Sequence, residues 1–498
     1  MNTSRGVKNI ICGIGYQVLT MAISIVIPRL VLLKLGSEIN GLTHSISSIF
    51  TYLTLLEAGV GKATQQALYK PLAEDNKDAI NRIMSATNKY YRRTGIVYAI
   101  VVFVFAVVYC LFVSTTIPIW IVFWVIVLSG ASSVISYFVQ GKYRVLMETE
   151  GKTYILTNLS SVCTICVSIF KIILLIYGFG IVAIQGMYLF FSLLQMGAIV
   201  YYIRRYYEWI DLNVEPNYAA ISQKNYVLLH QITGMIFNNT DVLLLTIFTN
   251  LKTVSVYSMY ATFYDIIKSV LNTISFSFSY VLGQVFHTDK EKFAKLHDVY
   301  ELYNMSLTFS LICVLNLFIL PFMKIYTDGV TDINYIDSTI PLLFTSVNLL
   351  SNGRASSSLV IDFAQHFEQT KERAILESFI NIIISIIGIY FFGIYGALFG
   401  TIFALFYRAN DMIIYASRLM HRTPLITYKR WIYNLIIFVI ITIIASHIMP
   451  IMDSIIDVVV CGIVGCMIII PVFLILDSIF EWKTACYAFH LLRKKNKT

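Results

Sequence analysis

Residues 154–203 read YILTNLSSVCTICVSIFKIILLIYGFGIVAIQGMYLFFSLLQMGAIVYYI, which is two apolar runs joined by a short turn near Tyr177–Gly180. The runs cover residues 154–177 and 179–203, and Lys171 is the single charged residue in them. A transmembrane helix needs about 20 mostly apolar residues. Each run is therefore long enough to cross a bilayer, and the stretch predicts a hairpin of two membrane-spanning helices.

The same pattern continues along the whole chain of 498 residues. Charged loops alternate with apolar runs, and the run at 253–284 is so long that it must tilt or project into water. The sequence predicts an all-α polytopic membrane protein with about fourteen transmembrane helices. The fourteen runs cover residues 10–33, 41–66, 94–114, 119–141, 154–177, 179–203, 226–248, 253–284, 300–323, 339–362, 373–393, 394–416, 431–450 and 455–479.

Composition excludes most soluble classes. Apolar residues make up 57% of the chain and charged residues 13%, against about 25% charged in ordinary globular domains. A soluble enzyme, a nucleic-acid-binding domain and a secreted disulfide scaffold cannot hide so much apolar surface. Most of the eight cysteines lie inside apolar runs, where they behave as small hydrophobes. Cys163 and Cys166 have no second pair, so we expect no metal.

Basic residues indicate the orientation of the predicted helices. With the N-terminus in the cytoplasm, 29 of the 37 Lys and Arg fall on the cytoplasmic side, and outside loops carry only Lys34, Lys252 and Lys324. Cytoplasmic loops of membrane proteins carry such an excess. We therefore expect both termini in the cytoplasm. The same rule accounts for the net charge of +9 without nucleic acid as a partner.

A charged connection at residues 77–93 has apolar residues on one helical face. In Lys77–Arg93 this face contains Ile80, Ile83, Met84 and Tyr91. The pattern predicts a helix lying on the inner leaflet, and an ordinary solvated connector is the alternative. The outside loops are short, which argues against a membrane polysaccharide polymerase that builds a site there.

An internal repeat divides the chain. Val31–Leu33 recurs as Val242–Leu244, an offset of 211 residues, and Gly180 recurs as Gly393, an offset of 213. Parallel repeats in transporters form two lobes with substrate between them. The predicted parts are a six-helix lobe, a cytoplasmic linker, a second six-helix lobe, and two extra helices with a basic tail, at residues 1–212, 213–225, 226–420 and 421–498.

Five basic residues lie inside predicted spans. A charge at the bilayer centre costs about 2.5–3.5 kcal/mol on insertion scales, so it usually faces a protein interior or a watery cavity. Snorkelling to the surface is the alternative for those near a helix end, and a buried pair with Asp241 or Asp265 for the most central one. The predicted cavity cations are Lys268, Arg354, Arg29, Arg408 and Lys171.

Several spans also carry polar stripes at helical spacing, which lipid does not tolerate. Such stripes either glue helices together or line a hydrated cavity whose hydroxyls and Tyr faces suit a sugar. Acidic residues near them are candidates for coupling to protons or sodium. The predicted sugar contacts are Tyr257, Tyr260, Tyr264, Asn272, Gln17 and Asn238, and the predicted coupling residues are Glu57, Asp241 and Asp265.

No cofactor is expected from the motifs. Gly59–Thr64 carries Gly-Lys, but a phosphate-binding loop also needs Gly at position 56 and Ser or Thr at position 63, where this chain has Leu56 and Ala63. The chain alone is therefore not expected to use ATP, and it shows no catalytic triad or zinc motif.

Three segments carry a family resemblance. Leu55–Thr64 followed by Tyr69–Ala73, then Asn239–Leu244, and finally Gly393–Gly400 resemble segments of polysaccharide flippases. The chain is similar to O-antigen and capsule repeat-unit flippases of the Wzx type. These belong to the multidrug/oligosaccharidyl-lipid/polysaccharide exporter superfamily, and the resemblance covers nearly the whole chain.

The resemblance implies alternating access by two six-helix, MATE-like lobes in a bacterial plasma membrane. The cargo would be an oligosaccharide on undecaprenyl pyrophosphate, moved to the outer leaflet for O-antigen lipopolysaccharide, capsule or exopolysaccharide. Other polysaccharide-assembly membrane proteins are candidate partners. A MATE-like drug or metabolite exporter is the alternative, although a cavity for cationic drugs should favour acidic residues over cations. A membrane polymerase is a further alternative.

Overall fold

The computed structural model describes residues 3–495, except residues 54, 114, 140 and 222–238. All regular elements in these ranges are helices, so the predicted all-α class is confirmed. Contacts within the chain divide it into two compact units, Met1–Ser255 and Val256–Thr498.

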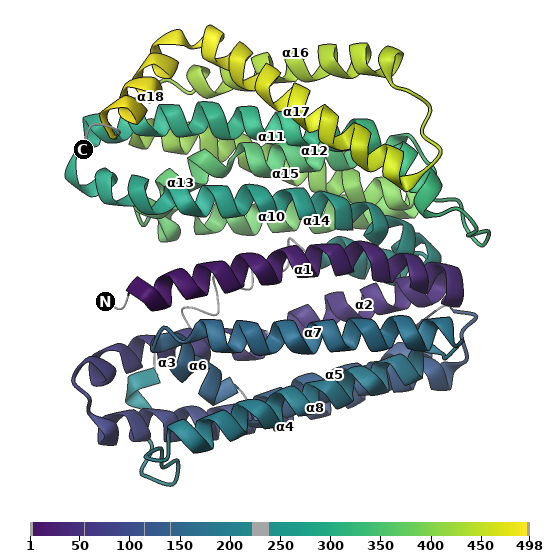
Figure 1. The fold of residues 1–498 in the computed structure, drawn as a ribbon, viewed down its shortest axis with the longest axis vertical. Helices are drawn as coiled ribbons and strands as arrows, with labels where there is room; N and C mark the ends of the chain where they lie inside the picture. Colours follow the sequence, from purple (N-terminus) through teal and green to yellow (C-terminus); the bar gives the residue numbers. More distant parts are fainter. Residues whose placement is uncertain (1–2, 54, 114, 140, 222–238, 496–498) are drawn as a thin grey trace. The chain divides into compact units, whose positions relative to one another are not determined.

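In the described part of unit 1 the chain forms α1 to α8, one short 3-10 helix and a further helical stretch at residues 239–248 (Figure 1). Within it α4 packs against α5 and α3, α5 against α8, and α7 against both α1 and α8. The described helices are α1 (Thr3–Leu35), α2 (Ser37–Leu53), α3 (Leu55–Ala73), α4 (Lys77–Phe112), α5 (Ile119–Val139), α6 (Gly141–Thr149), α7 (Thr153–Ile176), α8 (Ile181–Tyr206) and η1 (Ala219–Ile221), and residues 239–248 are also helical.

Unit 2 starts within the first turns of α10 (Leu251–Thr288). Here α14 packs along α15, and α11 packs against α12, α16 and α17. The remaining helices are α11 (Lys290–Tyr326), α12 (Thr339–Gly353), α13 (Ala355–Phe363), α14 (Phe367–Phe392), α15 (Ile394–Leu419), α16 (Leu425–Ile448), α17 (Ile455–Phe480) and α18 (Trp482–Lys495).

Eleven helices in the described ranges are long and apolar enough to cross a membrane. The other three predicted spans are not among these eleven helices. Span 41–66 is described on either side of residue 54, as α2 and α3. Span 339–362 forms α12 and α13 with a break at Arg354. Of span 226–248, only residues 239–248 lie in the described part. The chain is a multi-pass membrane protein.

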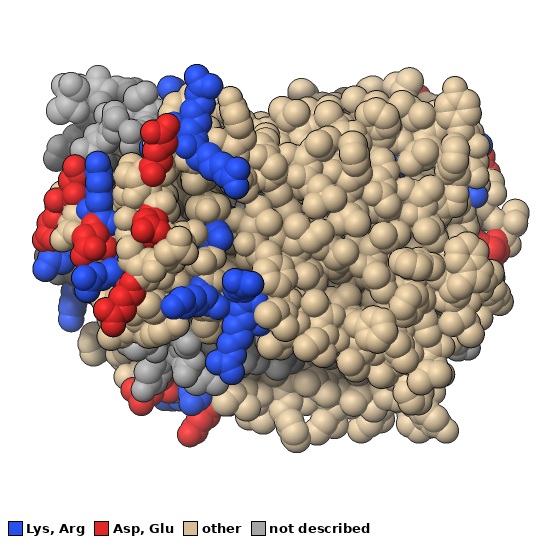
Figure 2. Space-filling view, turned by 90° about the horizontal axis from the view of Figure 1, so that it is seen from below, with Lys and Arg blue, Asp and Glu red and all other residues tan. Residues whose placement is uncertain are grey.

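Charged side chains avoid a wide band of the surface. On the face drawn in Figure 2, most Lys, Arg, Asp and Glu gather toward one end, a few lie at the other end, and the broad area between them has almost no charged residues. Large apolar side chains are exposed on the long helices, for example Ile100 and Phe103 on α4 and Trp124 on α5. Such exposure is unfavourable in water and is expected where lipid covers the helix.

Element boundaries repeat between the units. α4 begins at Lys77 and α11 at Lys290, an offset of 213 residues. α7 and α14 begin at Thr153 and Phe367, an offset of 214. The capping residues repeat as well. Asn76 accepts a hydrogen bond from the Ala79 backbone at the start of α4, and Asp289 accepts one from Lys292 at the start of α11. The helix order within the units follows the repeat predicted from the sequence.

The amphipathic segment Lys77–Arg93 does not form a separate helix on the membrane surface. It is the first part of α4, and its apolar residues Ile80, Ile83 and Met84 are buried against residues of α3, α6 and α8. The apolar face was predicted correctly, but protein covers it. The sequence pattern could not distinguish these two coverings, because both require the same spacing of apolar residues.

The domain boundaries predicted at 212 and 226 differ from the division between compact units, which falls at Ser255. Residues 222–238 lie outside the described ranges. The position of the linker at 213–225 therefore stays a prediction, as does the limit of the C-terminal extension at 421.

Candidate functional site

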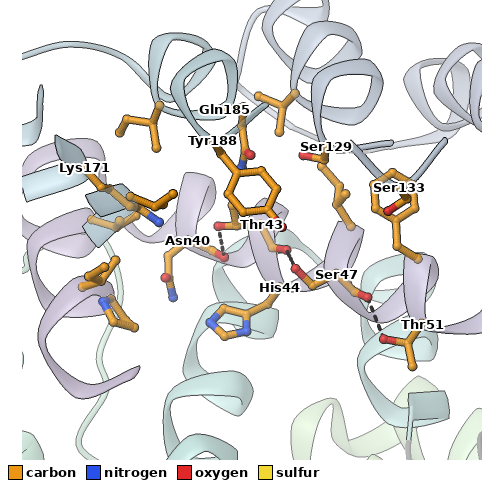
Figure 3. A pocket seen from close by; sticks show the side chains of 18 residues that line it. Asn40, Thr43, His44, Ser47, Thr51, Ser129, Ser133, Lys171, Gln185 and Tyr188 are labelled. Carbon is orange, nitrogen blue, oxygen red and sulfur yellow. Dashed lines mark hydrogen bonds between the residues drawn. The ribbon is translucent and has the colours of Figure 1, made fainter. Parts of the chain in front are cut away.

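An open cavity of about 510 Å³ lies within unit 1, between α1, α2, α5, α7 and α8 (Figure 3). Its size is within the range of about 300–1,000 Å³ that is typical of small-molecule sites. Lys171 is the one Lys or Arg among the lining residues, and no Asp or Glu is among them. The polar lining residues are Asn40, Thr43, His44, Ser47, Thr51, Ser129, Ser133, Lys171, Gln185 and Tyr188.

Helix α2 is oriented by contacts on its buried residues. Asn40 donates from Nδ2 to Ser255 Oγ at 2.8 Å, and the hydroxyls of Ser45 and Thr246 lie 2.7 Å apart. A Cβ on Gly41 would lie 1.7 Å from the backbone oxygen of Leu251, so only glycine permits this approach. These contacts fix the rotation of α2, which leaves His44 and a row of hydroxyls on the cavity.

The row of hydroxyls runs along α2 through Thr43, Ser47 and Thr51. Ser47 Oγ donates to the Thr43 backbone oxygen at 2.8 Å, and Thr51 Oγ1 donates to the Ser47 backbone oxygen at 2.9 Å. Because the hydroxyl protons of Thr43 and Ser47 are used within the helix, the lone pairs of these two oxygens remain as acceptors. This wall can accept hydrogen bonds from hydroxyl groups of a ligand.

Lys171 reaches the cavity from the C-terminal half of α7 (Figure 3). It has no hydrogen-bond or ion-pair partner in the described parts of the chain, and the His44 ring is a further nitrogen-bearing group of the lining. An ammonium group held in a membrane protein without a counter-ion is costly. The cavity is therefore a positively charged environment that an anion would stabilise.

The wall opposite α2 contributes groups that can both donate and accept. Ser129 and Ser133 lie one turn apart on α5, and Gln185 and Tyr188 lie one turn apart on α8. Within the described residues none of these four side chains has a hydrogen-bond partner. These four side chains are therefore available to form hydrogen bonds with a polar ligand or with water.

The predicted cations of unit 2 lie in a different environment. Arg354 donates to Glu377 at 2.7 Å, and Arg408 lies 3.4 Å from Glu377 and 2.6 Å from Asp411. Arg373 joins the same group at 2.7 Å from Asp411. We call these five residues the unit 2 charge cluster. The three arginines exceed the two carboxylates by one charge, and each arginine is held by a carboxylate of the protein itself.

Lys268 lies on α10 with Asp265 one turn away, and their charges interact. Asp265 and Asn272 are exposed, whereas Lys268 is half-buried. These three belong to unit 2, as the charge cluster does. Their predicted roles in cargo binding and ion coupling stay predictions.

The predicted tyrosine stripe of α10 packs into unit 2. Tyr260 donates to the Tyr335 backbone oxygen at 2.7 Å, and Tyr264 donates to the Pro341 backbone oxygen at 2.9 Å. Tyr257 and Tyr264 also contact the Phe344 ring. This packing gives the tyrosines a role in joining α10 to α12, and the sugar contacts predicted for them stay predictions.

The remaining predicted residues are in unit 1. Arg29 and Gln17 are half-buried on α1, and the Gln17 backbone oxygen accepts a hydrogen bond from Thr20 at 2.9 Å. Asp241 is buried, with 7% of its surface exposed. Asn238 and the side chain of Glu57 lie outside the described part of the chain.

One group of residues has the spacing of metal ligands. Atoms of His297, Asp298 and Glu301 lie within 4.8 Å of one another. Arg422 lies 2.6 Å from Asp298 and 2.8 Å from Glu301, and Arg430 also binds Glu301. Two guanidinium groups already occupy the carboxylates, so this group is an ion-pair network and does not suit a metal ion.

Sequence reasoning selected Lys171, which lines this cavity, but missed most of the polar residues around it. The pairs Ser129–Ser133 and Gln185–Tyr188 follow helical spacing within strongly apolar runs. That spacing was the available signal. Their convergence on one cavity depends on the packing of α5 and α8, which the sequence pattern does not specify.

The sequence matches no protein-family model and no curated protein. Solved structures give clear similarities. A structure of the lipid II flippase MurJ in an inward closed conformation matches with a TM-score of 0.72 and 14% identity, covering 96% of this chain and 99% of that chain.

Two further matches are structures of MATE family multidrug resistance transporters of the MOP superfamily. The inward-facing structure has a TM-score of 0.65 at 13% identity, covering 80% of this chain and 95% of that one. The outward-facing structure has a TM-score of 0.51 at 13% identity, covering 82% and 95%. The chain therefore has the fold shared by the MurJ flippase and the MATE transporters of the MOP superfamily.

Proposed function

We propose that the chain is a flippase for lipid-linked oligosaccharides. The cargo is an oligosaccharide repeat unit on undecaprenyl pyrophosphate, moved by alternating access from the inner to the outer leaflet of a bacterial plasma membrane. The product would serve O-antigen, capsule or exopolysaccharide assembly. Both termini lie in the cytoplasm in this proposal, and other polysaccharide-assembly membrane proteins are its candidate partners.

The observation that carries the proposal is the cavity of unit 1. It combines one cation without a counter-ion, hydroxyl acceptors on α2 and unpaired polar groups on α5 and α8. Cations suit phosphate or carboxylate groups, and polar side chains beside apolar walls suit sugar rings, which have hydroxyl edges and less polar faces. A phosphate-linked saccharide has both features.

The extent of the structural similarity also supports a flippase. The MurJ structure covers 96% of the chain, whereas the inward-facing MATE structure covers 80%. The difference is comparable in size to the predicted C-terminal extension, residues 421–498. The MurJ structure is described as a lipid II flippase, and we extend a lipid-linked cargo to this chain as part of the proposal.

A MATE-like exporter of drugs or metabolites is the second candidate function, because the MATE structures share the fold. A site for cationic drugs would be expected to contain carboxylates, which bind cations and orient them. None is among the described residues that line the cavity. The flippase therefore fits the cavity better, and the exporter remains the outcome to test against.

The test is a deletion strain in which the surface-polysaccharide locus is otherwise intact. Labelled lipid-linked repeat units should accumulate on the cytoplasmic leaflet, and the wild-type gene should relieve this accumulation. Normal polysaccharide without accumulation, in a strain whose other flippase genes are also deleted, would contradict the proposal and favour the exporter. Dissipating proton and sodium gradients separately in the complemented strain tests the coupling proposed for Glu57, Asp241 and Asp265.

A further inference from the structure

Helices α11, α16 and α17 of unit 2 enclose a polar cluster that the proposed function does not use. The cluster consists of Ser306 on α11, Asn434 on α16 and Asp477 on α17, and all three residues are 0% exposed. Both α16 and α17 pack on α11. The cluster therefore lies inside the contact that attaches the two C-terminal apolar helices to the rest of unit 2.

Contacts between the helices bring the three side chains together. Asn434 Nδ2 donates to Asp477 Oδ1 at 3.2 Å, and Ser306 lies beside the same carboxyl group. One turn of α11 before Ser306, the hydroxyls of Tyr303 and Ser478 lie 3.0 Å apart. Because Ser478 directly follows Asp477 on α17, this second contact helps to hold the carboxyl group against α11.

The hydrogen bonding of the cluster is short of one donor. Three buried oxygens have no hydrogen-bond partner in the described chain, namely Asp477 Oδ2, Asn434 Oδ1 and Ser306 Oγ. The amide hydrogens of Asn434 are already used, since Nδ2 donates to the Arg430 backbone oxygen at 3.0 Å as well as to Asp477. The hydroxyl proton of Ser306 can satisfy only one of the two remaining acceptors. A proton on Asp477 would turn Oδ2 from an acceptor into a donor and so complete the cluster.

The charge of the cluster leads to the same conclusion. Arg430 lies one turn before Asn434 on α16, but its guanidinium donates to Glu481 through two hydrogen bonds of 2.7 Å and also binds Glu301. No cation among the described residues forms an ion pair with Asp477. A carboxylate buried without a counter-ion is strongly disfavoured, and such a group takes up a proton instead.

A metal cation fits these oxygens less well than a proton does. Hard cations such as Ca²⁺ and Mg²⁺ take about six or more oxygen ligands. Here three oxygens are free, and the side chains that carry them are closed to water. A proton needs only the carboxyl group and one acceptor beside it.

We propose that Asp477, Asn434 and Ser306 form a buried proton-binding site. With the proton bound, the neutral carboxyl group of Asp477 donates a hydrogen bond within the cluster and holds α16 and α17 against α11. Loss of the proton leaves an unpaired carboxylate where the three helices meet and weakens their contact. The acidic residues predicted above to couple transport to protons or sodium lie on other helices.

The pH response of this site follows from Asp477 itself. Among its charged neighbours, Arg430 on α16 binds both Glu481 on α17 and Glu301 on α11. Tyr433 on α16 donates its hydroxyl to the Leu476 backbone oxygen at 3.3 Å. An aspartate of the unfolded chain loses its proton near about pH 3.9. Because the folded protein keeps the proton to higher pH, the free energy of unfolding should fall as the pH rises above about 4.

The direct test is infrared spectroscopy of the purified full-length protein in lipid nanodiscs at about pH 6, where an ordinary aspartate is ionised. A protonated carboxyl group has a C=O stretching band that a carboxylate lacks. Wild type should show this band, and Asp477→Asn should lose it. Asp453→Asn is the matched control, because Asp453 is exposed just before α17, and it should keep the band.

Thermal unfolding of the same variants gives a second readout. The Asp477→Asn side chain is neutral and can donate a hydrogen bond, so its unfolding midpoint should be close to that of wild type at about pH 5. The midpoint of wild type should then fall below that of the variant, and the gap should widen up to about pH 8. Asp453→Asn should follow wild type throughout.

A further variant serves if Asp477→Asn does not fold. Asn434→Leu removes the hydrogen bond from Nδ2 to Asp477 Oδ1. The C=O band of the protonated carboxyl group should therefore shift to higher frequency. An unshifted band in folded Asn434→Leu would contradict the proposal.

The proposal is overturned if wild type and Asp477→Asn show the same protonated-carboxyl bands, or if the gap between their unfolding midpoints does not change with pH. A sodium site would also overturn it and has its own signature. Replacing potassium by sodium at constant pH would then raise the midpoint of wild type but not that of Asp477→Asn, and no band would be lost in the variant.

Discussion

Helix α7 of unit 1 and helix α14 of unit 2 hold equivalent places in the repeat, because they begin at Thr153 and Phe367, an offset of 214 residues. α14 packs tightly on its neighbour α15. A Cβ on Gly396 would lie 1.9 Å from the backbone of Gly388. At the offset of 213 residues that relates Gly180 to Gly393, unit 1 has Leu175 on α7 and Ala183 on α8, whose Cβ atoms do not permit so close an approach.

Helices α7 and α14 also differ in how their charged residues are paired. On α14, Glu377 binds Arg354 and Arg408, whereas α7 presents Lys171 to a cavity without a carboxylate in its lining. In unit 2 the buried charges pair with one another and hold the helices together. In unit 1 the charge of Lys171 stays available to a ligand. Two copies of one architecture can thus divide structural and ligand-binding roles.

The largest expected effect comes from Glu377→Ala in the unit 2 charge cluster. Glu377 is 9% exposed, and its removal leaves Arg354 and Arg408 without their shared carboxylate. Breaking a buried ion pair by removing one partner costs about 3–5 kcal/mol. The midpoint of thermal unfolding in detergent should fall by many degrees. A change of the size seen for surface pairs, below about 1 kcal/mol, would mean that the cluster is not structural.

Lys171→Met should have the opposite effect on stability. The ammonium of Lys171 has no ion-pair partner in the described chain, so its removal relieves a desolvation cost without leaving an orphaned carboxylate. We expect an unchanged or higher unfolding midpoint together with lost binding of anions. A clear drop in the midpoint would show that Lys171 supports the fold, and the contrast between the units would disappear.

The packing difference gives a smaller effect. Gly396→Ala forces a methyl group into the backbone of Gly388, and overpacking typically costs about 1–3 kcal/mol. The matched change in unit 1 is Ala183→Gly, which removes a methyl group and should cost about 1 kcal/mol or less in a helix. Unfolding midpoints of the two variants test this order. Equal effects would mean that α7–α8 packs as closely as α14–α15.

The smallest expected effect concerns two carboxylates beside the ends of helices. Burial raises the pKa of Glu38, but hydrogen bonds from Thr116 and Thr115 outweigh this and leave the pKa below its usual value. Burial likewise raises the pKa of Asp337, and hydrogen bonds from Tyr395 and Thr339 bring it below its usual value. One such carboxylate serves each unit.

The sign of the pH effect follows from these lowered values. A carboxylate with a depressed pKa in the folded state adds stability above its unfolded pKa, and this is lost as the pH falls through the folded pKa. The unfolding midpoint should therefore fall as the pH is lowered below about 4.5, and Glu38→Gln or Asp337→Asn should each reduce this dependence. If a variant keeps the wild-type pH dependence, the carboxylate that it lacks does not contribute to this loss of stability.

Much of the fold followed from apolar run lengths and glycine positions. Span 154–177 corresponds to α7, Thr153–Ile176, and span 394–416 to α15, Ile394–Leu419. Breaks inside spans were missed, since Arg354 divides α12 from α13 within an uninterrupted polar-striped run. Hydropathy gives the length of an apolar run, but it does not reveal a local break in the helix.

The site was less predictable. Charge depth selected Lys171 and also Arg354 and Arg408, but it could not tell which of them has a carboxylate partner. Glu377 lies 23 residues from Arg354 in the sequence. The packing of helices α13, α14 and α15 against one another brings these residues together. The tyrosines of α10 illustrate the same limit, because a polar stripe can bond to a neighbouring helix as readily as to a ligand.

The most direct test of this account is the rate at which proteoliposomes containing the chain flip a lipid-linked acidic oligosaccharide. Wild type, Lys171→Gln, Lys171→Arg and Lys324→Met would be compared at equal amounts of folded protein. The account predicts that Lys171→Gln loses about tenfold or more of the rate, while Lys171→Arg and Lys324→Met retain most of it. Equal rates for wild type and Lys171→Gln would contradict the claim that the cavity of unit 1 binds the cargo.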